Sequence, residues 1–120
     1  MNSEVNRVKQ IKIGINDCYL PVKVILADNF FTRLRGLTGR TSLNLDEGLL
    51  LRPCNGVHTY FMKFAIDVIY ISRDGKILKI VEGLKPNKIS KGFKNTHQIL
   101  ELSEGAAAKL GLKIKDRILF

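Results

Sequence analysis

The sequence predicts an α+β domain in which mainly antiparallel strands form a small barrel or sandwich with two short helices. Short apolar runs recur along the chain, turn residues separate them, and helical spacing occurs in only two segments. The 120 residues are 45% hydrophobic and 26% charged, as in an ordinary globular protein with enough surface to bury in one core. We therefore predict a flexible segment over residues 1–7 and a single globular domain over residues 8–120.

The first predicted element is a β-hairpin. Apolar and polar residues alternate over residues 8–15, as in a strand with one solvated face. Asn16 and Asp17 are typical turn residues, and residues 19–27 form the second predicted strand.

A short helix is expected next, because Asp28 can accept hydrogen bonds from the free N–H groups of a first helical turn. The residues that recur at helical spacing are Phe30, Phe31, Leu34 and Leu37. Gly36 and Gly39 end this segment. The fully apolar residues 49–51 then predict a buried strand.

Residues 57–71 are too long for one strand, since strands usually contain about five or six residues. We expect a bend at residues 62–65. A hairpin about Met62 and Lys63 would place His58 opposite Asp67, and a wider corner is the alternative.

The dipeptide Asp74-Gly75 predicts a tight turn that joins strands at residues 68–71 and 77–81. Residues 98–102 read as a further strand. Ser103 is expected to cap a helix over residues 104–110, which Gly111 ends, and residues 112–120 are expected to form a final strand.

The net charge is +9, with 20 Lys and Arg residues against 11 Asp and Glu residues. Such an excess favours contact with polyanions, but scattered basic residues also serve solubility. One cluster stands out, made of Lys85, Lys88, Lys91 and Lys94. We expect this segment to be a solvated loop. The chain lacks the aromatic and basic signature of an RNA-binding sheet, so a nucleic-acid partner is not favoured.

The sequence contains no apolar run of the roughly 20 residues that a membrane-spanning helix needs and no signal-peptide pattern. We therefore expect a cytoplasmic protein. Cys18 and Cys54 fit no zinc spacing and are expected to be free thiols. His58 and His97 add no metal-ligand pair at a regular spacing, so we predict no metal site and no cofactor.

Several motifs together resemble one prokaryotic family, the domain of unknown function 192. They are residues 33–37 (RLRGL), 47–50 (EGLL), 53–59 (PCNGVHT), 62–68 (MKFAIDV) and 74–75 (DG), followed by 100–102 (LEL). The resemblance extends from about residue 22 to the end of the sequence. It implies a small mixed β domain with short helices, and it implies no particular activity.

Cys54, His58 and Asp67 are the candidate site residues, with two interpretations. In the first, His58 activates the Cys54 thiol and Asp67 orients the imidazole, as in a Cys-His-Asp nucleophilic site. In the second, Cys54 is a packed small residue, His58 bonds a backbone group and Asp67 accepts hydrogen bonds from turn N–H groups.

Basic and aromatic residues near these candidates favour an anionic ligand. The predicted ligand-binding residues are Arg35, Arg52, Lys63 and Tyr60. Our leading hypothesis is a binding module with a polar pocket for a small anionic ligand or a protein segment. The alternatives are a Cys-His hydrolase or acyl-transfer enzyme and, third, nonspecific nucleic-acid binding through the segment from Lys85 to Lys94.

Overall fold

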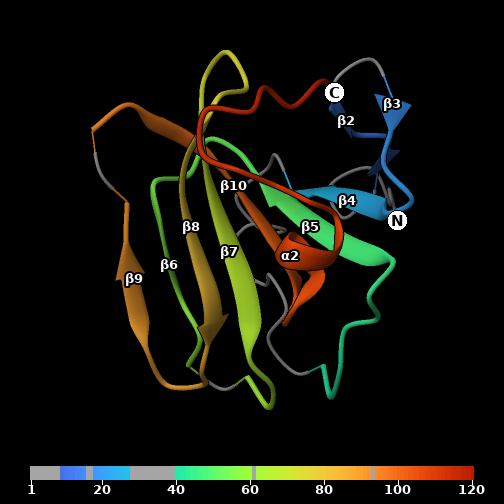
Figure 1. Ribbon diagram of the computed structural model, residues 1–120. Helices are drawn as coiled ribbons and strands as arrows, with labels where there is room; N and C mark the ends of the chain where they lie inside the picture. Colours follow the sequence, from blue (N-terminus) through green and yellow to red (C-terminus); the bar gives the residue numbers. More distant parts are fainter. Residues whose placement is uncertain (1–8, 16–17, 28–39, 61, 93) are drawn as a thin grey trace, which may run out of the picture.

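The computed structural model describes residues 9–15, 18–27, 40–60, 62–92 and 94–120, with the side chains described from residue 12 onwards. A six-stranded sheet forms its centre (Figure 1). In spatial order the strands are β1 (Lys9–Ile11), β4 (Lys23–Ala27), β5 (Glu47–Leu51), β10 (Thr96–Ser103), β7 (Ile66–Ser72) and β8 (Ile77–Leu84). Among the described strands, only β4 and β5 pair in parallel, and their connection over residues 28–46 has the length that such a crossover requires.

Two small ribbons flank this sheet. One joins β2 (Gly14–Ile15) to β3 (Cys18–Tyr19), and the other joins β6 (Gly56–His58) to β9 (Ile89–Lys91). The helix α2 (Ala106–Lys109) lies in front of β5 and β10 in Figure 1. No helix in the described part of the chain is long and apolar enough to cross a membrane.

The central sheet buries both of its faces, because side chains alternate between the faces of each strand. On one face, Ile69 and Leu100 pack with α2 in the first core cluster. On the other face, Val68 and Ile99 pack in a second cluster, against which Val57 of β6 is placed. All seven residues of β7 are buried. The described residues thus form one small β-rich domain with a core on each side of the sheet.

The predicted class is right at the level of a β-rich, mainly antiparallel fold, and the barrel or sandwich is not found. The six-stranded sheet is open, with β1 and β8 at its edges. Within the described ranges there is one short α-helix, α2. The helix expected after Asp28 and the segment 1–7 lie outside the described residues.

Several local predictions are confirmed. The Asp74-Gly75 turn joins β7 to β8, and Gly75 has a φ of 95°, which favours glycine. The apolar residues 49–51 lie in the buried strand β5. The expected break falls between β6 and β7. The N-terminal hairpin is also present, interrupted between β1–β4 pairing and β2–β3 pairing.

Other predictions are wrong. The chain does not fold back about Met62 and Lys63, because β6 pairs with β9 while β7 pairs with β8 and β10. Residues 112–120 form isolated bridges, such as the one from Leu119 to Gly14, instead of a strand. The expected lysine loop contains the strand β9, which includes Lys91.

Candidate functional site

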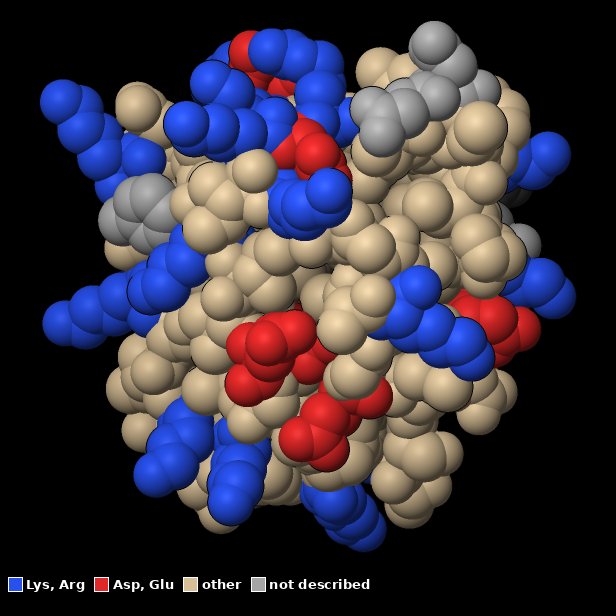
Figure 2. All heavy atoms as spheres, in the orientation of Figure 1, with Lys and Arg blue, Asp and Glu red and all other residues tan. Residues whose placement is uncertain are grey.

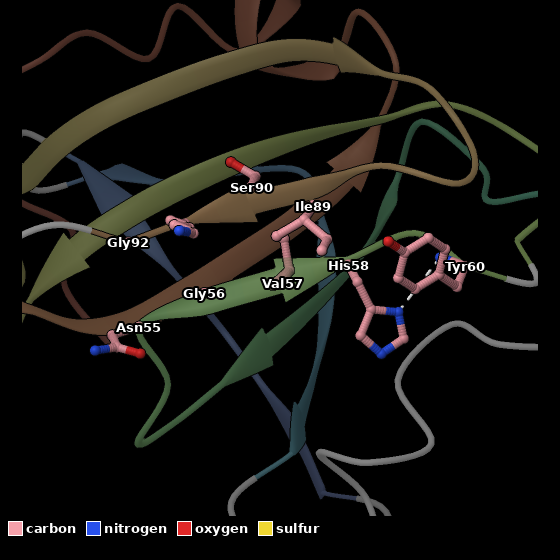
Figure 3. Close-up of a pocket in the computed structure, with 9 residues that line it drawn as sticks. Asn55, Gly56, Val57, His58, Tyr60, Ile89, Ser90 and Gly92 are labelled. Atoms are coloured by element: carbon pink, nitrogen blue, oxygen red, sulfur yellow. Dashed lines mark hydrogen bonds between the residues drawn. The ribbon is translucent and has the colours of Figure 1, made fainter.

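A cleft of about 480 Å³ lies over the ribbon of β6 and β9 (Figure 3). Antiparallel pairing sets His58 opposite Ile89 and Val57 opposite Ser90. Strand alternation then separates the two pairs: His58 and Ile89 are exposed, whereas Val57 packs against the core and Ser90 is buried. The cleft is lined by residues 55–58, Tyr60 and residues 89–92.

His58 supplies a hydrogen-bond donor to this cleft. Its Nδ1 atom accepts a hydrogen bond from the backbone N–H of Tyr60 at 3.3 Å, and the two rings lie side by side with centroids 5.2 Å apart (Figure 3). A neutral imidazole that accepts at Nδ1 carries its proton on Nε2. In that form the free edge of the ring presents an N–H group.

Cys54 is held by its own neighbours. Its thiol donates to the carbonyl of Gly56 at 3.2 Å, and its backbone N–H donates to the carbonyl of His97 at 2.8 Å. The side chain is half-buried and packs against the second core cluster. The described hydrogen bonds do not include one between Cys54 and His58.

Asp67 is fully buried, and its carboxylate accepts three backbone hydrogen bonds. Gly83 donates to Oδ1 at 2.9 Å, while Gly105 and Ala107 donate to Oδ2 at 3.1 Å and 3.0 Å. Gly105 is the N-cap of α2 and makes no side-chain cap of its own. The acceptor at this helix start is therefore Asp67, where Ser103 was expected.

The sequence-predicted Cys-His-Asp arrangement is not assembled in the described hydrogen bonds. Asp67 lies on the face of β7 that packs toward α2, opposite Leu102 of β10, whereas His58 lies opposite Ile89. His58 and Asp67 do not lie opposite each other, because β6 pairs with β9 whereas β7 pairs with β8 and β10. The Asp67 contacts match the alternative interpretation, in which this acid satisfies backbone N–H groups.

The predicted ligand-binding residues are also dispersed. Tyr60 lines the cleft and is 39% exposed. Arg52 is half-buried: its Nη1 atom donates to the Gln98 side chain at 3.4 Å, and its guanidinium lies 5.6 Å from the Phe120 ring centroid. Lys63 is exposed outside the cleft lining. Arg35 lies outside the described residues.

Glu101 is a buried acid that was not among the site residues predicted from the sequence. It is 4% exposed, and burial raises its pKa to about 7. Among the described residues, none donates a hydrogen bond to its carboxylate. The available signal was the position of a single acid between Leu100 and Leu102 in a buried strand.

Tyr70 and Ser90 form a second buried polar feature, connecting β7 to the back of the cleft ribbon. Their hydroxyl groups share a hydrogen bond, and Tyr70 has no exposed surface. Burial raises the pKa of Tyr70, and the hydrogen bond with Ser90 opposes this rise. This contact holds β9 against the central sheet.

Metal ligands are not gathered in the described part of the chain. No group of three or more His, Cys, Asp or Glu side chains there could hold an ion. His97, a ligand considered from the sequence, is half-buried. Its pKa is lowered by burial and by the nearby charges of Arg73 and Arg52.

Comparison with known proteins gives a family and a fold. The sequence pattern of the family DUF192, described as "Uncharacterized ACR", matches residues 11–120. The chain therefore belongs to this family. No curated protein matches the chain.

Two solved structures are similar to this chain. A protein of unknown function from Novosphingobium aromaticivorans has a TM-score of 0.80 at 21% identity, and the alignment covers 94% of this chain and 85% of that one. A proposed transcription regulator from Sinorhizobium meliloti has a TM-score of 0.81 at 22% identity, with 94% and 93% covered. At these identities the likeness shows the fold alone.

Proposed function

We propose that this chain, a member of the domain of unknown function 192 family, is a binding module whose ligand is anionic and occupies the cleft over β6 and β9. The observation that carries this proposal is the hydrogen bond from the Tyr60 N–H to the Nδ1 atom of His58 at the cleft. Because the Tyr60 N–H occupies Nδ1, the Nε2–H group is left as a donor at the cleft.

The charges around the cleft support an anion over a cation. Lys91 is exposed on β9 and adds an ammonium group, and Tyr60 and Asn55 add side chains that can donate hydrogen bonds. Among the described residues that line the cleft, none is acidic. Hydrogen bonds between such donors and a charged acceptor are stronger than neutral ones.

Binding is favoured over the Cys-His enzyme because the reacting groups are directed elsewhere. A hydrolase or acyl-transfer mechanism requires the histidine to accept the proton of the thiol. Here the Cys54 thiol donates to Gly56, and the acceptor nitrogen of His58 bonds Tyr60. Asp67 has its carboxylate committed to three N–H groups.

The proposal is tested by titrating the ¹⁵N-labelled protein with inorganic phosphate and, separately, with glutarate. We expect saturable shifts of the amide signals of residues 56–60 and 89–92. His58→Ala and Lys91→Ala should each weaken binding by about five- to tenfold, as expected for loss of one charge-assisted contact. Lys113→Ala, which removes an exposed lysine outside the cleft, is the matched control and should change nothing.

Two results would overturn the proposal. One is the absence of saturable shifts at the cleft amides with both probes. The other is an equal loss of affinity in the Lys113→Ala control, which would mean that the anions respond only to the overall charge.

A further inference from the structure

The outer edge of β9 has backbone groups that pair with none of the described residues. β9 pairs only with β6 among the described strands and lies at the margin of the molecule in Figure 1. The N–H of Thr59 donates to the carbonyl of Lys88, which makes these two residues a hydrogen-bonded pair. Such pairs alternate along an antiparallel ladder, so the next one is formed by Val57 and Ser90. The backbone groups of Ile89 and Lys91 therefore point away from β6, and no described hydrogen bond uses them.

Side chains along this edge also suit an added strand. Ile89 is 60% exposed and Lys91 is exposed, both on the cleft side of the ribbon. Ser90 points inward and bonds Tyr70, which fixes the ribbon on the sheet. A strand beside β9 would thus find rigid backbone partners and could extend alternate side chains over the cleft.

The charge at this edge selects the kind of partner. Figure 2 shows basic side chains along the margin where β9 lies in Figure 1, with acidic side chains toward the middle of that face. The exposed lysines of this segment are Lys85, Lys88, Lys91 and Lys94. Lysines on an edge strand oppose pairing with another copy of the same edge. An acidic segment removes that repulsion.

We propose that the outer edge of β9 binds an acidic protein segment in extended conformation by β-strand addition. The inference rests on the proposed function, because acidic side chains of the segment would occupy the same anion cleft. Main-chain hydrogen bonds to Ile89 and Lys91 supply affinity, and the lysines and His58 supply the preference for acids.

The decisive experiment uses the unchanged protein and three hexapeptides, acetylated and amidated, in which Glu and Val alternate. One peptide is unmodified, one carries N-methyl groups on each Glu, and one carries them on each Val. Only alternate residues of an added strand bond to β9. One methylated peptide should therefore bind at least about tenfold more weakly than the unmodified peptide, and the other should stay within about threefold.

The peptide series separates this inference from the proposed function. If both methylated peptides bind like the parent while the cleft amides still shift, strand addition is wrong and anion binding stands. If neither the parent peptide nor inorganic phosphate shifts the cleft amides, both fail. The identity of the weaker methylated peptide reports whether the segment runs parallel or antiparallel to β9.

Variants of the edge give a second measurement. Ile89→Pro removes the outward N–H and leaves the β6 hydrogen bonds of Ser90 in place, so it should weaken the parent peptide about tenfold. Ile89→Thr, which keeps the N–H, is its control. Lys91→Glu should also weaken binding about tenfold and reduce its salt dependence, whereas Lys113→Glu should not. A single-stranded oligonucleotide that bound more tightly than the peptide through Lys91 would overturn the inference in favour of nucleic acid.

Discussion

Two buried carboxylates lie on neighbouring strands of the central sheet, and their surroundings differ. Asp67 of β7 is paired with Leu102 of β10, and Glu101 of β10 is paired with Val68 of β7. Their side chains point to opposite faces. Asp67 accepts three backbone hydrogen bonds at the start of α2 and from Gly83, whereas Glu101 receives none from the described residues.

This difference shows that burial alone does not define the role of an acid. Three N–H donors replace the water that Asp67 loses on folding, so its buried side chain is fully hydrogen-bonded in the folded arrangement. Glu101 loses water without gaining a donor from the described residues, and burial raises its pKa from 4.5 to about 7. Asp67 thus has a structural role as an acceptor at the start of α2, and Glu101 is an acid whose charge depends on pH near neutrality.

Removing Asp67 should give the largest effect. Asp67→Ala leaves three N–H groups without their acceptor, and at least Ala107 is itself buried. We expect the free energy of unfolding to fall by about 3–5 kcal/mol. The measurement is urea unfolding at constant m value. Glu82→Ala, which removes an exposed acid on β8, is the control and should change stability by less than about 0.5 kcal/mol.

If Asp67→Ala lowered the free energy of unfolding by less than about 1 kcal/mol, the contrast drawn between Asp67 and Glu101 would be wrong. It would mean that the three N–H groups find water or other acceptors when the carboxylate is removed.

The burial of Glu101 should make the folded protein less stable as the pH rises, which is the reverse of the effect of an acid whose pKa is lowered by folding. Its pKa is higher in the folded than in the unfolded state, so between pH 4.5 and about 7 the folded state binds more protons. The free energy of unfolding therefore falls as pH rises through this window, by roughly 3 kcal/mol in total. Glu101→Gln should remove this component, which urea unfolding at pH 4.5, 6 and 8 would measure.

The control for Glu101 is the same pH series on Glu82→Gln, which should retain the slope of the unchanged protein. Identical slopes for the unchanged protein and Glu101→Gln would show that the folded environment supplies donors to Glu101, and the contrast with Asp67 would disappear.

The hydrogen bond between the hydroxyl groups of Tyr70 and Ser90 should contribute least to stability among the three features tested. Tyr70→Phe removes the hydrogen bond to Ser90 without removing a charge. We expect a loss of about 1–2 kcal/mol, and a coupling energy near 1 kcal/mol in a double-mutant cycle with Ser90→Ala. A coupling energy near zero would show that the two hydroxyl groups do not hold β9 on the sheet.

Local chemistry made part of this structure predictable. Asp74-Gly75 specifies its turn from two residues, and residues 49–51 are apolar enough to indicate a buried strand without knowledge of its partners. The bend before β7 follows from the length of the run over residues 57–71, which exceeds that of a usual strand. These predictions succeed because the deciding contacts lie within a few residues.

The rest depended on distant partners. β6 pairs with β9, and β10 lies between β5 and β7, which no local pattern at His58 or Glu101 indicates. The prediction of a final strand was wrong because Lys113 and Asp116 form a turn within residues 112–120, and Ile114 is 56% exposed. For Asp67, both interpretations fitted the sequence, and only the position of α2 distinguishes them.

The contacts of Asp67 also bear on the order in which the chain can fold. Its hydrogen-bond donors lie 16, 38 and 40 residues further along the sequence. Synthesis proceeds from the N-terminus, so strand β7 leaves the ribosome long before Gly105 and Ala107 do. Burying β7 before Gly105 and Ala107 have been made would leave Asp67 without two of its three donors. The energetic cost of that burial disfavours collapse of a partly synthesised chain before β10 and α2 have been made.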